Sequence, residues 1–534
     1  MHCAVLLPLL LAPADLIVVN AKVWTDGKLH PGLDTLAVRG GRFIGIAKGR
    51  GAWTSRTIID ARGRVVIPGI IDSHTHIASS GTSLLELQLR PAKSKAHFIQ
   101  LVREYSANQP KGAWIIGGGW SAESWPEKEQ PTKEWIDAVT GGRPAILRRM
   151  DGHSALANSE ALRRSGITRD TPNPPGGVID KDPATGEPTG MLRETATGLV
   201  RRPAPSEDEV YRGLLAAVRE ANRHGVTAVS DISTVGRFAA VRRYAQSTNP
   251  TLRFAMYATP GADWSPTLKA IKNFKGVRMW AEPKGLKEYM DGSLGSRTAF
   301  MAEPFTKPLP GQKELRGVPM PGALDGTYAR GVREAAEMGL QVIIHAIGDQ
   351  ANHDVLELYA QNVPKLASHR FRVEHVQHLL PADIARFGQL EVIPSMQPYH
   401  KADDGRYCEE VIGTERSRTS YTFSSLLRTG ARLAFGSDWP VVTISPWEGI
   451  RAAVTGKIMT GRIWMPHENI SFDQALTCYT SNAAYAMGWE KEIGRIAPGY
   501  RADFVILDRS PYQAGVDLST IKPVAVYVEG RKAL

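Results

Sequence analysis

The chain has 534 residues, which is long for one minimal domain but suits a large barrel with a satellite domain. Hydrophobic residues make up 42% and charged residues 22%, an ordinary globular balance that supports a sizeable core. The net charge is +11, but the basic residues are scattered, so surface solubility explains them better than attraction to anionic substrates or surfaces, and nothing resembles a nucleic-acid module. Three cysteines without a Cys-x-x-Cys pair argue against a thiolate metal site.

Residues 1–14 form a separate apolar leader, with Met-His-Cys before a run that is too short to span a bilayer. The run resembles the hydrophobic region of a secretory signal, with Ala12 and Ala14 near a cleavage point, but no lysine or arginine precedes it. Two alternatives follow: an exported protein, periplasmic or secreted, whose signal is truncated, or a cytoplasmic protein with an apolar tail. We favour export, and no other stretch predicts an integral membrane segment.

The two ends of the chain are rich in short strands and turns. Residues 15–67 contain an apparent hairpin with Gly40-Gly41 at its corner, and residues 491–534 have the same β-rich character. Because both segments flank a long middle of different character, we predict one small composite β-sandwich built from both chain ends.

The middle, residues 68–490, alternates apolar strands with helical stretches such as 328–338, 350–360 and 381–388. This pattern predicts an α/β fold of the (β/α)8 TIM-type, with a long insertion at about 77–223 between the first two strands. Long loops over strand ends often select substrate. The eight predicted strands are 66–74, 226–232, 252–258, 285–291, 340–346, 371–377, 391–397 and 432–438.

The first barrel strand ends in two histidines, His74 and His76. Residues i and i+2 of a strand face the same side, so both imidazoles can bind one ion. The alternative is a pair of half-exposed strand histidines, but their place at the end of an apolar strand favours a metal site. Asp72 has the parity to face the same way.

Three later strands also end in metal-ligand residues: His345, His375 and Asp438. A lone histidine at a strand end more often satisfies a hydrogen bond, but two at equivalent depth on consecutive strands favour a metal site. Asp438 is either a turn aspartate or a carboxylate that binds the metal and shuttles a proton. His378 falls on the opposite strand face or in the next loop, and we assign it a supporting catalytic or substrate-contacting role.

Lys287 lies within a predicted strand whose neighbours end in ligands. Most lysines are solvated, but burial at this place lowers the pKa of the amine, which can then take up carbon dioxide as a carbamate that bridges two metals. Lys284 has the opposite strand parity and is the weaker candidate.

Four further residues are candidates for contacting substrate. Asp291 begins a loop directly after a barrel strand, and Arg297 in that loop either anchors a carbonyl or carboxylate or pairs with Asp291. His153 in the insertion could donate a hydrogen bond, and Trp120 could line an apolar pocket, although both residue types are as often structural.

Several motifs taken together resemble the amidohydrolase superfamily. They are VIPGIIDSHTH, IHAIGD, VEHVQH, FGSDWP and IGRIAPGYRADFVILD, while MDGSLGSRTA, DGHSALANS and TGMLRE resemble the branch containing N-substituted formamide deformylases. The resemblance, which runs from Asp15 to Asp508, implies a distorted (β/α)8 barrel with a composite sandwich and one or two divalent ions, usually zinc. It also implies a set of metal-site residues: His74, His76, His345, His375 and Asp438, with Lys287 matching the lysine of binuclear forms.

These expectations predict a metal-dependent hydrolase of non-peptide C–N bonds in a small-molecule amide. The metal activates water and polarises the carbonyl, and Asp438 moves the proton from water to the departing nitrogen. One alternative is a deaminase or cyclic-amide hydrolase, which would use the same metal site. Another is a non-catalytic secreted metal-binding protein, against which the complete ligand set argues. Because barrel amidohydrolases are often dimers, a homodimer is also expected.

Overall fold

The structure is a computed structural model that describes residues 13–51, 53–122, 125–127, 129–149, 154–174, 176–308 and 314–534. The leader expected at 1–14 lies outside the described residues, apart from its last two positions. The chain forms two compact units: residues 1–79 with 217–534, and residues 80–216.

Eight parallel strands form the centre of the first unit, which confirms the predicted (β/α)8 barrel. Every predicted barrel strand is present, with all neighbours parallel. The strands in spatial order are β8 (Ile70–Thr75), β15 (Val226–Ser233), β16 (Arg253–Ala258), β17 (Ala281–Tyr289), β18 (Gln341–Ala346), β19 (Arg372–His375), β20 (Ile393–Met396) and β21 (Ala434–Phe435).

The predicted first strand, 66–74, is in fact two strands that meet at Gly69. The segment β7 (Val65–Pro68) belongs to the sandwich, and only β8 belongs to the barrel. A Cβ added at Gly69 would lie 2.2 Å from the Thr227 hydroxyl, so the close approach of the neighbouring strand requires glycine here. Both strands are buried, and therefore no change in hydrophobic pattern marked the boundary between them.

The barrel is closed by backbone contacts between the end of β8 and the segment after β21. The Asp438 N–H donates to the His74 carbonyl at 2.7 Å, and the His76 N–H donates to the Trp439 carbonyl at 2.9 Å. Gly436 permits this approach, since a Cβ there would lie 2.5 Å from the backbone nitrogen of His74. The closure therefore brings His74, His76 and Asp438 to one place.

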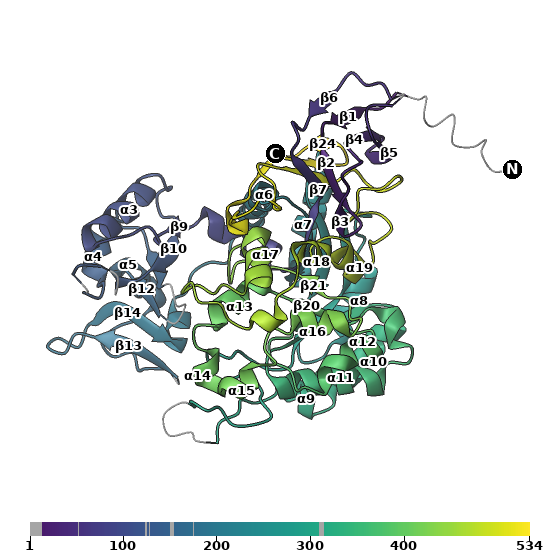
Figure 1. The fold of residues 1–534 in the computed structure, drawn as a ribbon. Helices are drawn as coiled ribbons and strands as arrows, with labels where there is room; N and C mark the ends of the chain where they lie inside the picture. The colour runs from purple at the N-terminus through teal and green to yellow at the C-terminus, as the bar shows by residue number, and fades with distance from the viewer. Residues whose placement is uncertain are drawn as a thin grey trace. The chain divides into compact units, whose positions relative to one another are not determined.

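Helices flank the barrel strands, as the βα pattern predicts. The predicted stretches correspond to α10 (Thr327–Glu337), α11 (Asp349–Asn362) and α12 (Asp383–Gln389), which Figure 1 shows side by side. Among the described residues, α6 (Glu207–Arg223) runs from the end of the insertion to the second barrel strand. The other helices of five or more residues that follow it are α7 (Phe238–Ala245), α8 (Ser265–Asn273), α13 (Pro398–Asp404), α14 (Cys408–Ile412), α16 (Phe423–Arg428), α17 (Pro446–Thr455), α18 (Phe472–Cys478) and α19 (Ser481–Ala486). Shorter turns of helix are α2 (Ile77–Ser80), α9 (Pro321–Leu324) and α15 (Thr414–Ser417).

Two small sheets share an apolar core, one built from N-terminal strands alone and the other from strands of both chain ends, as predicted for the composite sandwich. Phe43 from the N-terminal segment packs against Phe504 from the C-terminal segment, with ring centroids 6.1 Å apart. One sheet has the order β5 (Arg42–Ala47), β4 (Thr35–Arg39), β1 (Leu16–Val19), β6 (Ile58–Asp60), and the other has β24 (Arg531–Lys532), β23 (Pro523–Val528), β22 (Phe504–Leu507), β7, β2 (Lys22–Thr25), β3 (Lys28–Leu29).

The insertion is a folded unit with its own core rather than a set of long loops. Its aromatic core contains Phe98, Trp120, Trp125 and Trp135. Burial of such large rings makes a separate core possible in a segment of this size. A sheet has the order β13 (Gly177–Lys181), β14 (Pro188–Glu194), β12 (Ser154–Ala157), β11 (Ala145–Arg149), β10 (Ile115–Trp120), β9 (Leu87–Gln88), with helices α3 (Lys95–Ala107), α4 (Lys133–Asp137) and α5 (Ser159–Ser165).

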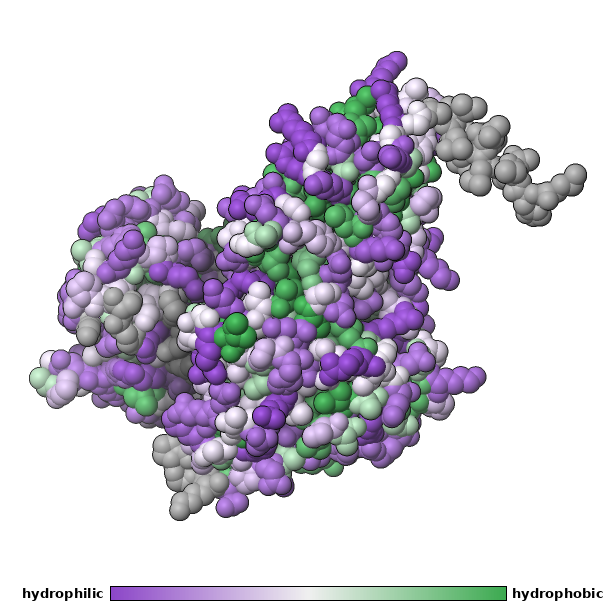
Figure 2. Space-filling view, in the orientation of Figure 1, coloured by the Kyte–Doolittle hydropathy of each residue, from purple (hydrophilic) through white to green (hydrophobic). Residues whose placement is uncertain are grey.

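The surface is polar over most of the face shown in Figure 2, with hydrophobic residues in small groups. Among the described residues, no helix combines the length and apolar character needed to cross a membrane.

Candidate metal centre and active site

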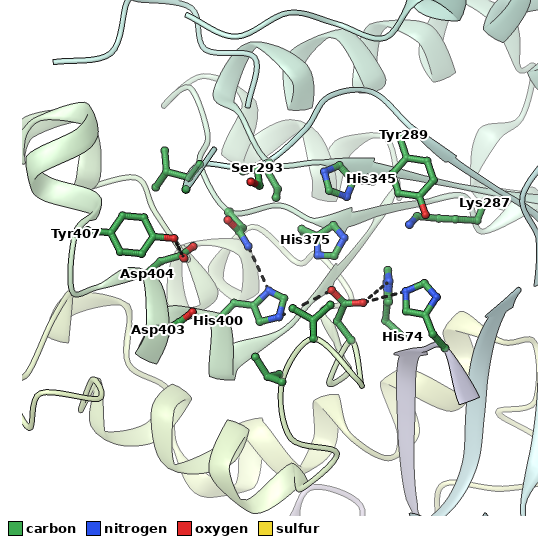
Figure 3. Close-up of a pocket in the computed structure, with 18 residues that line it drawn as sticks. His74, Lys287, Tyr289, Ser293, His345, His375, His400, Asp403, Asp404 and Tyr407 are labelled. Atoms are coloured by element: carbon green, nitrogen blue, oxygen red, sulfur yellow. Dashed lines mark hydrogen bonds and ion pairs between the residues drawn. The ribbon is translucent and has the colours of Figure 1, made fainter. Parts of the chain in front are cut away.

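The metal-site residues predicted from the sequence line one cavity in the barrel (Figure 3). The cavity has a volume of about 430 Å³ and lies where the carboxyl ends of the parallel strands meet. His74, His76, Lys287, His345, His375 and Asp438 all contribute to its wall. These six residues come from different parts of a long chain, and the closed barrel is what brings them together.

Two candidate metal clusters share Asp438. One combines His74, His76 and Asp438, the other His375, His400 and Asp438, and within each the ligand atoms lie within 4.8 Å of one another. Asp438 Oδ1 is 3.1 Å from His76 Nε2 and 3.4 Å from His74 Nε2. His74 Nε2 is buried without a hydrogen-bond partner among the described residues, which is the state of a nitrogen that a metal would satisfy.

In three of these histidines the other ring nitrogen, Nδ1, contacts an acceptor group of the protein. His74 Nδ1 contacts the Glu374 carboxylate, His76 Nδ1 lies 3.1 Å from the Ile232 carbonyl, and His375 Nδ1 lies 2.7 Å from Gln397 Oε1. An acceptor at Nδ1 places the proton there and leaves Nε2 as a lone pair facing the cavity. The three rings are therefore oriented as metal ligands, and the residues present fit a divalent ion.

Glu374 holds His74 as part of a buried charge network. Its carboxylate also accepts from Arg372 Nε at 2.7 Å, and Arg372 donates further to the Ser73 carbonyl at 2.9 Å. Burial raises the pKa of Glu374, but the charge of Arg372 and the hydrogen bonds from His74 and Arg372 outweigh it and lower the pKa to about 2. The carboxylate is therefore ionised at neutral pH and fixes the ring of His74.

We expect Glu374→Gln to lower the free energy of unfolding by about 3–5 kcal/mol, because Arg372 keeps a buried charge without its partner. It should also weaken metal binding about 10–100-fold, since His74 loses its orienting group. Because the folded-state pKa lies below the unfolded value, the stabilisation is present above about pH 4.5 and is lost as the pH falls toward 2.

Asp503→Asn provides a matched control for this prediction. Asp503 pairs with the buried Arg253 at 2.9 Å, away from the cavity lining. Both variants should lose stability in denaturant titrations, but only Glu374→Gln should lose metal affinity in competition with a chelator. Equal metal affinity in the two variants would contradict the orienting role.

Two residues of the site have left-handed backbone conformations, with φ of 76° at His375 and 60° at Asp438. Such conformations cost about 1–3 kcal/mol in residues other than glycine and concentrate at functional sites, where the surrounding structure imposes them. The backbone therefore turns at both strand ends in a way that a purely structural strand would avoid.

Burial alters the protonation of Lys287 and His345. Burial is the main cause that lowers the pKa of Lys287 to about 8, although Glu374 and Asp438 oppose it. Burial and the charge of Lys287 lower the pKa of His345 to about 3, so its ring is neutral, as a ligand must be. Lys284, in contrast, pairs with Glu282 at 2.7 Å, in agreement with the predicted strand parity.

Other predicted site residues have structural contacts instead. His378 is buried outside the cavity lining, with Nδ1 2.8 Å from the Ser420 hydroxyl. Asp291 accepts three backbone N–H groups, from Phe300, Ile347 and Gly348, which leaves little capacity for substrate.

Arg297 does not pair with Asp291 and does not line the cavity. Its guanidinium donates to the carbonyls of Leu294, Gly295 and Lys307. Trp120 is fully buried in the core of the insertion, where its N–H donates to the Leu147 carbonyl at 3.0 Å. These contacts account for both side chains without a substrate. His153 lies outside the described residues.

Several residues of the cavity were not predicted from the sequence. His400, Asp403 and Asp404 come from α13, Gln377 follows β19, and Tyr289 ends β17. Tyr289 has the same strand parity as Lys287, so that period-two pattern was a usable signal. For the α13 residues no such signal exists, because the sequence of a helix that follows a strand does not reveal which helix face will point to the mouth of the barrel.

This combination of a closed parallel barrel with imidazole and carboxylate ligands at one mouth defines a metal-dependent hydrolase. The family described as "Amidohydrolase family" matches residues 57–533, and the chain belongs to that family.

Three similar proteins show how far this relationship extends. The chain is 37% identical to Protein LONG AFTER FAR-RED 3 of Arabidopsis thaliana, over 97% of this chain and 91% of the relative. It is 27% identical to N-substituted formamide deformylase of Arthrobacter pascens, over 97% of both chains. An uncharacterized metal-dependent hydrolase from Pyrococcus horikoshii has a similar structure, with a TM-score of 0.76 and 26% identity over 95% of this chain and 99% of that one.

Proposed function

We propose that this amidohydrolase cleaves the C–N bond of a non-peptide amide, with zinc as its metal. The observation that carries the proposal is the convergence of His74, His76 and His375 on Asp438, each ring oriented through its Nδ1. The likeness to N-substituted formamide deformylase supports an amide as substrate. A neutral imidazole and carboxylate ligand set suits zinc.

The metal would be held by His74, His76 and Asp438, with His345 and His375 completing the set. When bound, zinc acidifies a coordinated water and polarises the substrate carbonyl. Asp438 lies between the two groups of histidines, where its carboxylate can take a proton from the attacking water and return it to the departing nitrogen.

His400 can stabilise charge on the substrate oxygen. Its Nδ1 lies 3.4 Å from Gln377 Nε2, an amide donor, so we assign the ring proton to Nε2, which makes His400 a donor and not the metal ligand that its place in the second cluster would allow. Nε2 has no hydrogen-bond partner among the described residues and is 3.9 Å from Asp438 Oδ2. An N–H donor aimed at the place where negative charge develops lowers the barrier. This role replaces the one considered for His378.

A panel of N-acyl amines tests the function. Protein supplied with zinc should release an acid and a substituted amine from at least one amide, and chelator treatment should abolish this, with recovery on adding zinc. Release of ammonia from a heterocycle instead would identify a deaminase of the same family. Absence of turnover of every amide by fully metal-loaded protein would refute the proposal.

We further propose that Lys287 is carboxylated and that its carbamate would help to hold a second zinc ion. Its neutral amine can attack carbon dioxide, forming a carbamate with loss of a proton, and its lowered pKa of about 8 favours that form. Lys287→Ala should then lose one of two bound metals and about 10²-fold or more of activity.

Short-chain carboxylates should restore part of the activity of Lys287→Ala, because they replace the bridging group. Lys284→Ala, which alters an ion-paired lysine of the same strand, is the control. Unchanged metal content and activity in Lys287→Ala would rule out the carbamate.

A further inference from the structure

The cavity has a second end, opposite the metal-site histidines in Figure 3, formed by α13 and Tyr407. His400, Asp403 and Asp404 occupy positions i, i+3 and i+4 of α13 and so share one helix face. Lys401, the basic residue of this helix, points elsewhere and donates to Asn469 Oδ1 at 3.0 Å. The end of the cavity formed by α13 therefore presents carboxylates without a lysine from the same helix.

The charges around the cavity contrast with those of the whole chain. The chain has a net charge of +11, yet the described residues that line the cavity include three aspartates and one lysine, with no arginine. That lysine, Lys287, lies at the metal end. The carboxyl terminus of α13 adds a partial negative charge at the other end. Among the lining side chains at this end, an anionic group of a substrate would meet carboxylates and no basic group.

Asp403 and Asp404 differ in their availability to a ligand. Asp404 is buried, and both its oxygens accept from phenols, from Tyr407 at 2.5 Å and from Tyr421. Asp403 is partly exposed and pairs with Arg406, whose side chain is 43% exposed. An exposed ion pair of this kind contributes little and exchanges readily with another cation. Asp403 is thus the residue that can contact a ligand directly.

A polar ligand within this cavity is also indicated by His400. Its Nε2 is buried, has no hydrogen-bond partner among the described residues and lies 3.9 Å from Asp438 Oδ2. Leu294, Ile347 and Val442 add apolar surface to the same wall. The lining therefore offers three features to an amide substrate. His400 can donate to the substrate carbonyl, the apolar side chains can contact a hydrocarbon spacer, and the Asp403 carboxylate lies beyond them.

We propose that the enzyme selects amides whose amine portion ends in a cation, which Asp403 binds, and rejects those ending in a carboxylate. The proposal rests on the amide hydrolysis put forward above and adds the charge of the substrate. In this proposal the ammonium group of the substrate takes the place of the Arg406 guanidinium as the ion-pair partner of Asp403.

Three formamides of equal chain length test it: N-formylpentylamine, N-formyl-diaminobutane and N-formyl-aminopentanoate, which end in methyl, ammonium and carboxylate. The ammonium compound should have the highest kcat/KM and the carboxylate the lowest. Asp403→Asn should raise KM for the ammonium compound about tenfold with little change in kcat, as loss of a charged hydrogen bond predicts. KM for the methyl compound should change less than about twofold.

Arg406→Gln should act in the opposite direction, lowering KM for the ammonium compound, because the competing cation is removed. This variant also keeps the test decisive if Asp403→Asn folds poorly. Glu415→Gln is the matched control, since Glu415 pairs with Arg418 at the same i, i+3 spacing on an exposed helix away from the cavity lining. It should leave the ranking of the three compounds unchanged.

Calorimetric titration of the same compounds into zinc-loaded full-length protein separates this proposal from the catalytic one. If none is cleaved but the ammonium compound binds best and Asp403→Asn removes that preference, charge selection stands and amide hydrolysis fails. If the carboxylate compound binds or reacts as well as the ammonium compound, or if Asp403→Asn weakens all three equally, charge selection is overturned.

Discussion

Replacing His74 with alanine should remove bound zinc and activity together. The ring is fully buried, held through Nδ1 by Glu374, and directs Nε2 toward Asp438 and His76. Without this ligand zinc would not be held where it could acidify water, whose pKa in bulk lies about nine units above its value on zinc. We expect kcat/KM to fall at least about 10⁴-fold, which elemental analysis and turnover measured on one sample can check.

His467→Ala is the control for this variant, because His467 is exposed and contacts the Arg418 carbonyl outside the cavity lining. It should retain full metal content and activity. Normal zinc content and normal turnover in His74→Ala would show that the cluster with Asp438 is not the metal site.

Asp438→Asn should separate catalysis from metal binding. Asparagine keeps a neutral oxygen near His74 and His76 but cannot take up the proton of the attacking water. We expect kcat to fall about 10²–10⁴-fold even at saturating zinc, since this is the usual contribution of a positioned general base. Metal affinity should also fall, because a charged ligand is lost.

Measurement of kcat across a zinc titration distinguishes these two effects. A value that stays low after the metal site is filled assigns the proton transfer to Asp438. Recovery of native kcat at high zinc would mean that Asp438 serves the metal alone and that another group moves the proton. Asp403→Asn is a useful comparison, as it should alter KM in a substrate-dependent way and leave kcat nearly unchanged.

The barrel, and the cavity that most of the candidate metal-site residues share, were predictable because they depend on local, periodic features. A strand alternates its side chains with period two, so the spacing of His74 and His76 and the parity that prefers Lys287 over Lys284 can be read without coordinates. Parallel strands in a barrel also present their carboxyl ends at one mouth. His345, His375 and Asp438 could therefore be assigned to the same site from their places at strand ends.

Which groups hold and complete this site was decided only by the tertiary structure. Glu374 reaches His74 across 300 residues of sequence, and the face that α13 turns to the cavity, with His400 and Asp403, depends on how the helix packs. Packing likewise placed Trp120 in the core of the insertion and surrounded Asp291 with backbone donors. Residue type and spacing determined which side chains could bind a metal here, whereas contacts between distant segments, which follow from burial and packing, decided which of them share the cavity.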